Sequence, residues 1–153
     1  MFAGRPINIE DMVARLKQVA NDLGLPFGSR EKTYNSRLAQ ELGKWAESEG
    51  KGDEFHHAVF RAYFAEGLNI GEISTLVKIG EKIGLPEENL RTVLDTRAYK
   101  DAVDSDWARS YQLGITAVPT FMINRQTLVG AQPYNVLAKF MDSNHITRRN
   151  ADR

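Results

Sequence analysis

The sequence of 153 residues contains no cysteine, so the chain can form no disulfide bond and carries no thiol of its own for disulfide exchange. The absence of cysteine fits a protein of a reducing compartment, and we expect a cytoplasmic location. No apolar run approaches the roughly 18 residues that a membrane-spanning helix needs. The first six residues also lack the apolar centre of a signal peptide. We therefore expect no membrane partner.

An excess of charge of one sign is also missing. Twenty basic residues balance twenty acidic ones, whereas nucleic-acid-binding surfaces normally show a basic excess. Glycine-rich phosphate loops and the G-x-S-x-G nucleophile motif do not occur. We therefore expect no nucleic-acid partner, and we assign no catalytic residue.

The titratable clusters do not resemble metal sites. His56 and His57 are adjacent, so on a helix their side chains point about 100° apart and bind one ion poorly. Asp101, Asp104 and Asp106 lack the glycine turn and the terminal glutamate of a calcium loop. We interpret these residues as solvated surface groups and expect neither a metal nor another cofactor.

Apolar residues recur at helical spacing through most of the chain, whose length fits one compact domain. In the third predicted helix Phe60 and Phe64 widen the apolar arc, which favours burial against several neighbours. In the sixth, Trp107 and Tyr111 are expected to face inward. The pattern predicts seven helices, the first capped by Asn8, within residues 8–23, 35–50, 53–66, 69–83, 86–94, 98–113 and 134–141.

Two short apolar runs, residues 120–123 and 127–130, flank the polar tripeptide Asn124-Arg125-Gln126. This arrangement predicts a β-hairpin. Pro119 stands just before the first strand, where a missing N–H is tolerated. The predicted fold is mainly α with a small β-hairpin. We expect a helical domain over residues 1–113, a β-β-α segment over 114–143 and a polar tail over 144–153.

Two motifs resemble a known family. The string V-P-T-F at 118–121, followed by the hairpin and by G-A-Q-P at 130–133, resembles the C-terminal half of the thioredoxin fold. The run F-R-A-Y-F-A-E-G-L-N-I at 60–70 looks like the helical insertion of DsbA-like proteins. Together the motifs are similar to the DsbA-like thioredoxin family, in its FrnE-type branch of dithiol-disulfide oxidoreductases. The resemblance extends from about residue 22 to residue 141.

The resemblance implies an incomplete thioredoxin-like fold with a DsbA-type helical insertion domain. In that family the proline of the V-P-T motif is cis, lies beside the redox cysteines, and follows backbone that binds the substrate chain. Carried over, the substrate-binding residues are Ala117, Val118, Pro119 and Thr120. The family's C-x-x-C motif belongs to an N-terminal segment that this chain lacks. We therefore expect no thiol exchange from the chain by itself.

Three other interpretations stay open. The chain is a non-catalytic module that binds a peptide or protein, or it is a fragment of a full-length oxidoreductase, or, more weakly, it is a relative of glutathione-dependent isomerases. In a complete thioredoxin fold the strand at 120–123 pairs with a strand from the N-terminal segment. Its edge is expected to be unpaired here, which favours a homodimer formed through that edge, with hairpin edges or helical faces meeting across a two-fold axis.

Overall fold

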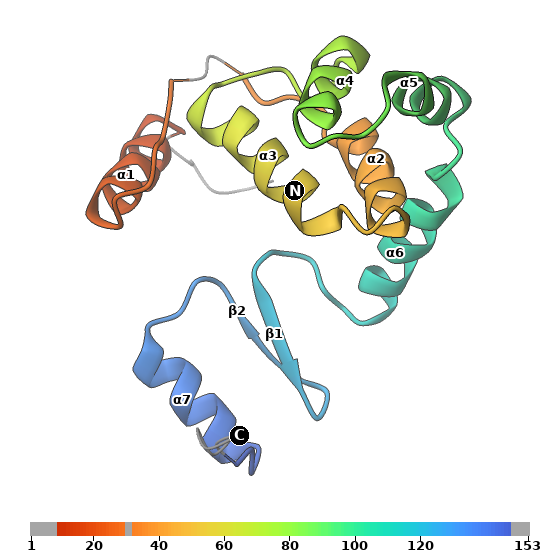
Figure 1. Cartoon of the computed structure of the whole chain (residues 1–153). Helices are drawn as coiled ribbons and strands as arrows, with labels where there is room; N and C mark the ends of the chain where they lie inside the picture. Colours follow the sequence, from red (N-terminus) through yellow and green to blue (C-terminus); the bar gives the residue numbers. More distant parts are fainter. Residues whose placement is uncertain (1–8, 30–31, 148–153) are drawn as a thin grey trace, which may run out of the picture. The chain divides into compact units, whose positions relative to one another are not determined.

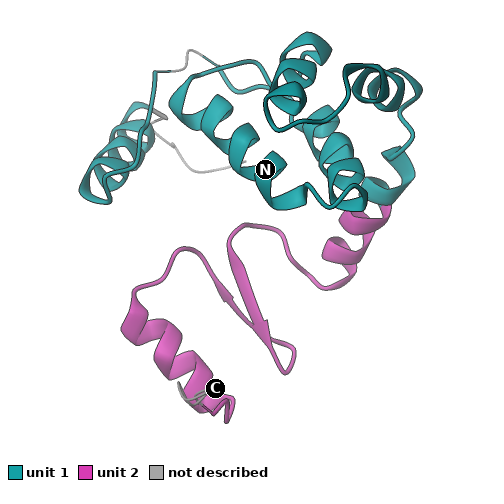
Figure 2. Cartoon of the chain, viewed as in Figure 1, with its two compact units in different colours: residues 1–104 teal, residues 105–153 magenta. Residues whose placement is uncertain are grey.

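The computed structural model describes residues 9–29 and 32–147. The predicted cap Asn8 lies outside the described residues, as does the end of the predicted tail, 148–153. The chain divides into unit 1, residues 1–104, and unit 2, residues 105–153 (Figure 2). No helix in the described part of the chain is long and apolar enough to span a lipid bilayer.

Every helix predicted from the sequence has a counterpart, and the hairpin is present (Figure 1). The elements in chain order are α1 (Ile9–Asp22), α2 (Arg37–Ser48), α3 (Gly52–Phe60), the π-helix η1 (Arg61–Ala65), α4 (Ile73–Lys82), α5 (Glu87–Thr96), α6 (Lys100–Gln112), β1 (Thr120–Ile123), β2 (Gln126–Val129) and α7 (Tyr134–Ser143).

Unit 1 has a well-buried core between α2, α3, α4 and α5. Leu42, Phe55, Leu76 and Leu90 are each 0% exposed and come from these four helices in turn. Removing one such side chain from water contributes about 1.5–3 kcal/mol to folding. The apolar stripe of each helix therefore faces the others, as the helical spacing in the sequence predicts.

A glycine sets the closest approach in this core. A Cβ atom on Gly80 of α4 would lie 2.4 Å from Cδ2 of Leu90 on α5 and 3.2 Å from its Cγ. Both residues are buried, so the leucine has little room to move. Glycine weakens a helix interior by roughly 1 kcal/mol relative to alanine, and here it is the residue that lets α4 pack directly on Leu90.

The apolar arc of the third predicted helix is not buried as expected. Phe60 and Phe64 are 59% and 40% exposed, although Phe55, Val59 and Ala62 face the core. The helix continues past Phe60 as η1, where the N–H of Glu66 donates to the C=O of Arg61 at 3.1 Å. Phe60 is the last residue of α3, one position after the buried Val59, and Phe64 lies within η1, so both rings lie off the face that packs on the core.

The expected burial of Trp107 and Tyr111 is also wrong, since they are 56% and 80% exposed. On α6 Val103 is buried, but it precedes the boundary at residue 104. Among the described residues of unit 2 only Asn144 is buried. A unit with one hairpin, one helix and part of another is too small to cover large aromatic rings.

The hairpin of unit 2 has a tighter turn than predicted. Asn124 and Arg125, with φ of 49° and 63°, form a two-residue loop, and β2 begins at Gln126, one residue earlier than expected. Two central residues with positive φ define a type I′ turn, whose twist matches that of the strands. The register pairs Thr120 with Val129 and Ile123 with Gln126.

The close packing of α4 on α5 gives a direct test. We expect Gly80→Ala to lower the free energy of unfolding in urea by about 1 kcal/mol or more, since overpacking of about 1–3 kcal/mol exceeds the gain in helix propensity. In a Leu90→Ala background, which supplies space, the same change should be neutral or stabilising. Lys78→Ala, on the exposed side of α4, is the control. A stabilised Gly80→Ala single variant would contradict the packing.

Candidate functional site

The predicted substrate-binding loop follows the end of α6. Gly114 has φ of 71°, its N–H donates to the C=O of Tyr111 at 2.9 Å, and the N–H of Ile115 donates to the C=O of Ser110 at 3.0 Å. These two bonds form a Schellman motif, which ends a helix and satisfies its last carbonyls. The chain therefore leaves α6 in a defined direction before it reaches the loop.

The structure gathers the four predicted residues into one short turn. The peptide bond between Val118 and Pro119 is cis, and Val118 is 88% exposed. The hydroxyl of Thr120 donates to the C=O of Ala117 at 2.6 Å, so these two residues close the turn around the exposed valine. The position of Val118 is therefore fixed by its neighbours while its own side chain faces solvent.

The hydrogen bonds of the hairpin show which edge of β1 is open. The N–H of Gly130 donates to the C=O of Pro119 at 2.8 Å. Because hydrogen-bonded positions alternate along an antiparallel pair, Phe121 and Ile123 direct their backbone groups to β2. The backbone N–H and C=O groups of Thr120 and Met122 then face away from β2. In the described part of the chain the sheet has no third strand on that side.

Val118 extends this open edge by one more residue. Neither its N–H nor its C=O takes part in a hydrogen bond with any described residue. The side chains from 113 to 123 carry no formal charge. An exposed row of backbone donors and acceptors with neutral side chains can bind an extended chain, and residues 113–123 contain no thiol, imidazole, amine or carboxyl group.

A polar cluster around one buried carboxylate in unit 1 was not singled out from the sequence. Glu41 of α2 is 2% exposed. Its Oε1 lies 2.6 Å from Nε of Arg37, and its Oε2 lies 2.6 Å from Nε of Arg97. Arg37 also contacts Oδ1 of Asp104 at 2.6 Å and donates to the C=O of Lys100 at 2.9 Å. The cluster thereby joins α2 to Arg97 in the α5–α6 connection and to the beginning of α6.

The electrostatics of this cluster stabilise the ionised carboxylate. Hydrogen bonds from Arg97, helped by those from Arg37, hold the pKa of Glu41 below its ordinary value, although burial acts in the opposite direction. Because each carboxylate oxygen already accepts bonds from arginine, the group is committed to structure and is a poor candidate for proton transfer. The available sequence signal was an acidic residue beside Leu38, Leu42 and Trp45 on the apolar stripe.

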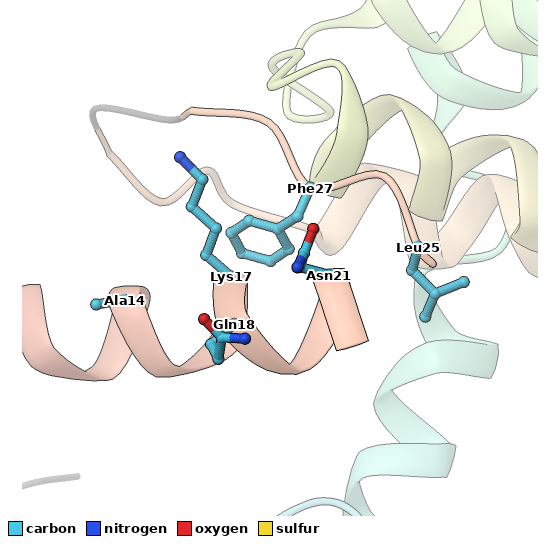
Figure 3. Close-up of a pocket in the computed structure, with 6 residues that line it drawn as sticks. All are labelled: Ala14, Lys17, Gln18, Asn21, Leu25 and Phe27. Atoms are coloured by element: carbon cyan, nitrogen blue, oxygen red, sulfur yellow. The ribbon is translucent and has the colours of Figure 1, made fainter. Parts of the chain in front are cut away.

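Two open cavities lie beside the connector that follows α1. The first, of about 360 Å³, is lined by Lys17, Gln18 and Asn21 of α1 and by Phe27, with Ala14 and Leu25 completing the set (Figure 3). The second, of about 450 Å³, is more apolar and is lined by Ala20, Leu25, Pro26, Phe27, His57, Phe60, Arg61, Phe64 and Ala65. Neither was predicted, because Phe27 lies in a connector without periodic pattern.

The candidate metal ligands are not brought together. Nε2 of His56 lies 3.3 Å from Oε1 of Glu47, whereas His57 lines the more apolar cavity. No group of three potential ligating side chains occurs among residues 9–29 and 32–147. The structure therefore offers no described cluster that would hold a metal ion.

The Glu41 cluster yields a prediction with a defined pH dependence. Glu41→Gln should lower the free energy of unfolding by about 2–3 kcal/mol near neutral pH, because charge-assisted bonds from two arginines are lost. The folded-state pKa of Glu41 is depressed, so its contribution is present above the ordinary value of about 4.3 and is lost as the pH falls below it. The difference between wild type and variant should therefore shrink in acid.

Urea unfolding followed from pH 7 down to pH 3 measures this difference. The matched control is Glu87→Gln, which removes an exposed i,i+4 pair with Arg91 and should have a much smaller effect. A Glu41→Gln loss that stays constant across this range would show that the charge of the carboxylate is not the source of the stability.

Comparisons with known proteins bear on the family and the fold. The sequence is 38% identical over 103 residues to the uncharacterized protein YwbO of Bacillus subtilis (strain 168), which covers 67% of this chain and 52% of that protein. The chain thus spans about half the length of the curated relative that it matches.

Two solved structures share the fold. A probable DsbA oxidoreductase, SCO1869 from Streptomyces coelicolor, superposes with a TM-score of 0.78 at 26% identity, over 99% of this chain and 68% of that one. A 2-hydroxychromene-2-carboxylate isomerase superposes with a TM-score of 0.72 at 20% identity, over 90% of this chain and 65% of that one, which shows likeness of fold alone. The family model of the DSBA-like thioredoxin domain matches residues 2–142, and the chain therefore belongs to that family.

Proposed function

We propose that the chain, a member of the DsbA-like family of thiol-disulfide oxidoreductases, binds extended polypeptide along Val118, Thr120 and Met122, the edge of β1 that the described residues leave without a third strand. The observation that carries this proposal is the exposed backbone of Val118, which is 88% exposed and makes no hydrogen bond to a described residue. It continues the open edge of β1, where an added strand gains main-chain hydrogen bonds.

The chemistry of this edge favours binding with little dependence on sequence. Main-chain groups recognise any extended chain, and specificity arises from pockets for alternate side chains. Residues 113–123 offer apolar and small polar side chains and no charge. Phe121 is 39% exposed and supplies an apolar contact. Such a surface suits unfolded segments, the form in which cysteine pairs of a substrate protein are accessible.

Disulfide exchange proceeds when a thiolate attacks one sulfur of a disulfide and expels the other sulfur as a thiolate. These 153 residues contain no cysteine, so a peptide held at Val118 can react only with sulfur supplied from outside them. On this proposal the chain positions the substrate and another group performs the exchange.

The open edge is also where a second copy of the chain would pair, as the sequence predicts. β1 has four residues, and a two-stranded pairing of this length is marginal in water. A peptide and a second β1 strand would use the same N–H and C=O groups of Thr120 and Met122. The two occupants therefore compete for the same edge.

Peptide binding is tested by removing one backbone donor. Val118→Pro deletes the N–H at this position and should weaken binding of a reduced, alkylated and fluorescently labelled unfolded polypeptide by about tenfold, the value of a hydrogen bond of roughly 1.4 kcal/mol. Val118→Ala keeps the N–H and shortens only the side chain, so it should bind within about twofold of wild type. Fluorescence anisotropy gives both affinities, and circular dichroism verifies the fold.

Equal affinities for Val118→Pro and wild type would remove the backbone of this residue from the binding site. A loss in Val118→Ala as large as that in Val118→Pro would instead assign recognition to the valine side chain. In neither case would the proposed main-chain pairing hold.

The absence of thiols predicts the outcome of a redox assay. The full chain should not accelerate the reduction of insulin by dithiothreitol or by glutathione above the uncatalysed rate, because no protein thiolate is available to carry the exchange. Turbidity of the precipitating insulin B chain reports the rate. An acceleration that grows with the concentration of the pure chain would contradict the prediction.

A further inference from the structure

The face of α1 opposite its polar side chains carries a row of exposed apolar residues. Met12, Leu16, Val19 and Leu23 are 46%, 47%, 48% and 67% exposed. The helical hydrogen bonding continues to Leu23, whose N–H donates to the C=O of Val19 at 3.1 Å. Spacings of four, three and four residues place all of them on one stripe, the a and d positions of a heptad repeat.

The orientation of α1 directs this stripe away from the part of unit 1 that the helix packs against. Lys17 and Asn21, from the polar side of the helix, project toward the ring of Phe27 in the chain's own connector (Figure 3). Ala20, next to the stripe, is buried at 7% exposure. The chain therefore packs against the flank and the polar side of α1, while the most apolar side faces solvent. Contiguous apolar surface of this kind marks an interaction site.

The charged residues beside the stripe indicate which partner fits it. We propose that α1 of a second copy of this chain packs antiparallel on this stripe across a two-fold axis. Leu16 then opposes Val19 of the second copy, and Met12 opposes its Leu23. Symmetry repeats each contact, so four apolar layers form from the four exposed residues.

The charged residues on one flank of the stripe, the flank that the chain's own connector does not cover, agree with the antiparallel arrangement. Arg15 and Asp22 both precede an a position and are exposed. In the antiparallel register Arg15 of each copy lies beside Asp22 of the other, which gives two ion pairs of opposite charge. A parallel pair would place Arg15 beside Ala20 and form neither ion pair. The charge pattern thus selects the antiparallel, self-complementary pairing.

An interface of two short helices is at the lower end of the size range for specific association. The dimer should accordingly dissociate on dilution. Because α1 belongs to unit 1 and the β1 edge to unit 2, the two proposed surfaces share no residue. Each can therefore be altered without changing the other.

The test is sedimentation equilibrium of the full chain from about 10 to 500 µM, where the wild type should show a reversible monomer–dimer equilibrium. Leu16→Glu, which removes two symmetric layers, should raise the dimer dissociation constant at least about tenfold. Arg15→Asp and Asp22→Arg should each weaken the dimer by placing like charges together. The double variant R15D/D22R restores opposite charges and should recover the wild-type constant.

Lys78→Glu, a charge reversal on the exposed face of α4, is the control and should leave the dimer unchanged. Circular dichroism of every variant verifies that helical content is retained. A dimer that persists in Leu16→Glu but is lost in Met122→Pro would overturn the α1 assignment in favour of the strand edge.

Failure of R15D/D22R to recover what the single reversals lose would overturn the antiparallel register. A wild type that remains monomeric over the whole range would overturn the proposal and leave the stripe to a different partner.

Discussion

The ion pairs of Glu41 connect parts of unit 1 that are distant in the sequence. Its carboxylate accepts bonds from Arg37 on the same helix and from Arg97, 56 residues later. Arg97 adopts a left-handed backbone conformation with φ of 55°, so the chain turns sharply where α5 ends. Packing among α2, α4 and α5 buries the apolar surface, and this carboxylate fixes where the chain turns toward α6.

Most of the helices and both strands could be predicted from short-range patterns in the sequence. Helical spacing located the helices, and turn residues located the hairpin, because both depend on neighbours within a few positions. The string Gly-Leu-Pro follows both α1, at 24–26, and α4, at 84–86. The hydrogen bonding is the same in both places, since the N–H of Leu25 and that of Leu85 each donate to the C=O five residues earlier. Proline at 119 marked the beginning of β1 because it cannot donate a bond toward β2.

The errors arose where burial depends on partners distant in the chain. Trp107 and Tyr111 have the spacing of a buried face, but spacing does not reveal whether enough surface exists to cover it. Phe60 and Phe64 widen the apolar arc in the sequence, but the core covers only the part of the arc that contains Phe55, Val59 and Ala62. Glu41 was missed because its two arginine partners become neighbours only after folding. The loop at 117–120 was predicted as a binding site through a family resemblance and not through any of its own chemistry.

The two-residue turn at Asn124-Arg125 also governs which side of β1 is available. Backbone hydrogen-bonding groups alternate between the two edges of a strand with a period of two. The pairing register therefore decides that the backbone groups of Thr120 and Met122 face away from β2, while those of Phe121 and Ile123 face β2. An extra residue inserted at this reversal that shifted the pairing by one would exchange the two sets. The backbone groups of Phe121 and Ile123 would then be accessible in place of those of Thr120 and Met122. Val118 would no longer lie in line with the accessible groups.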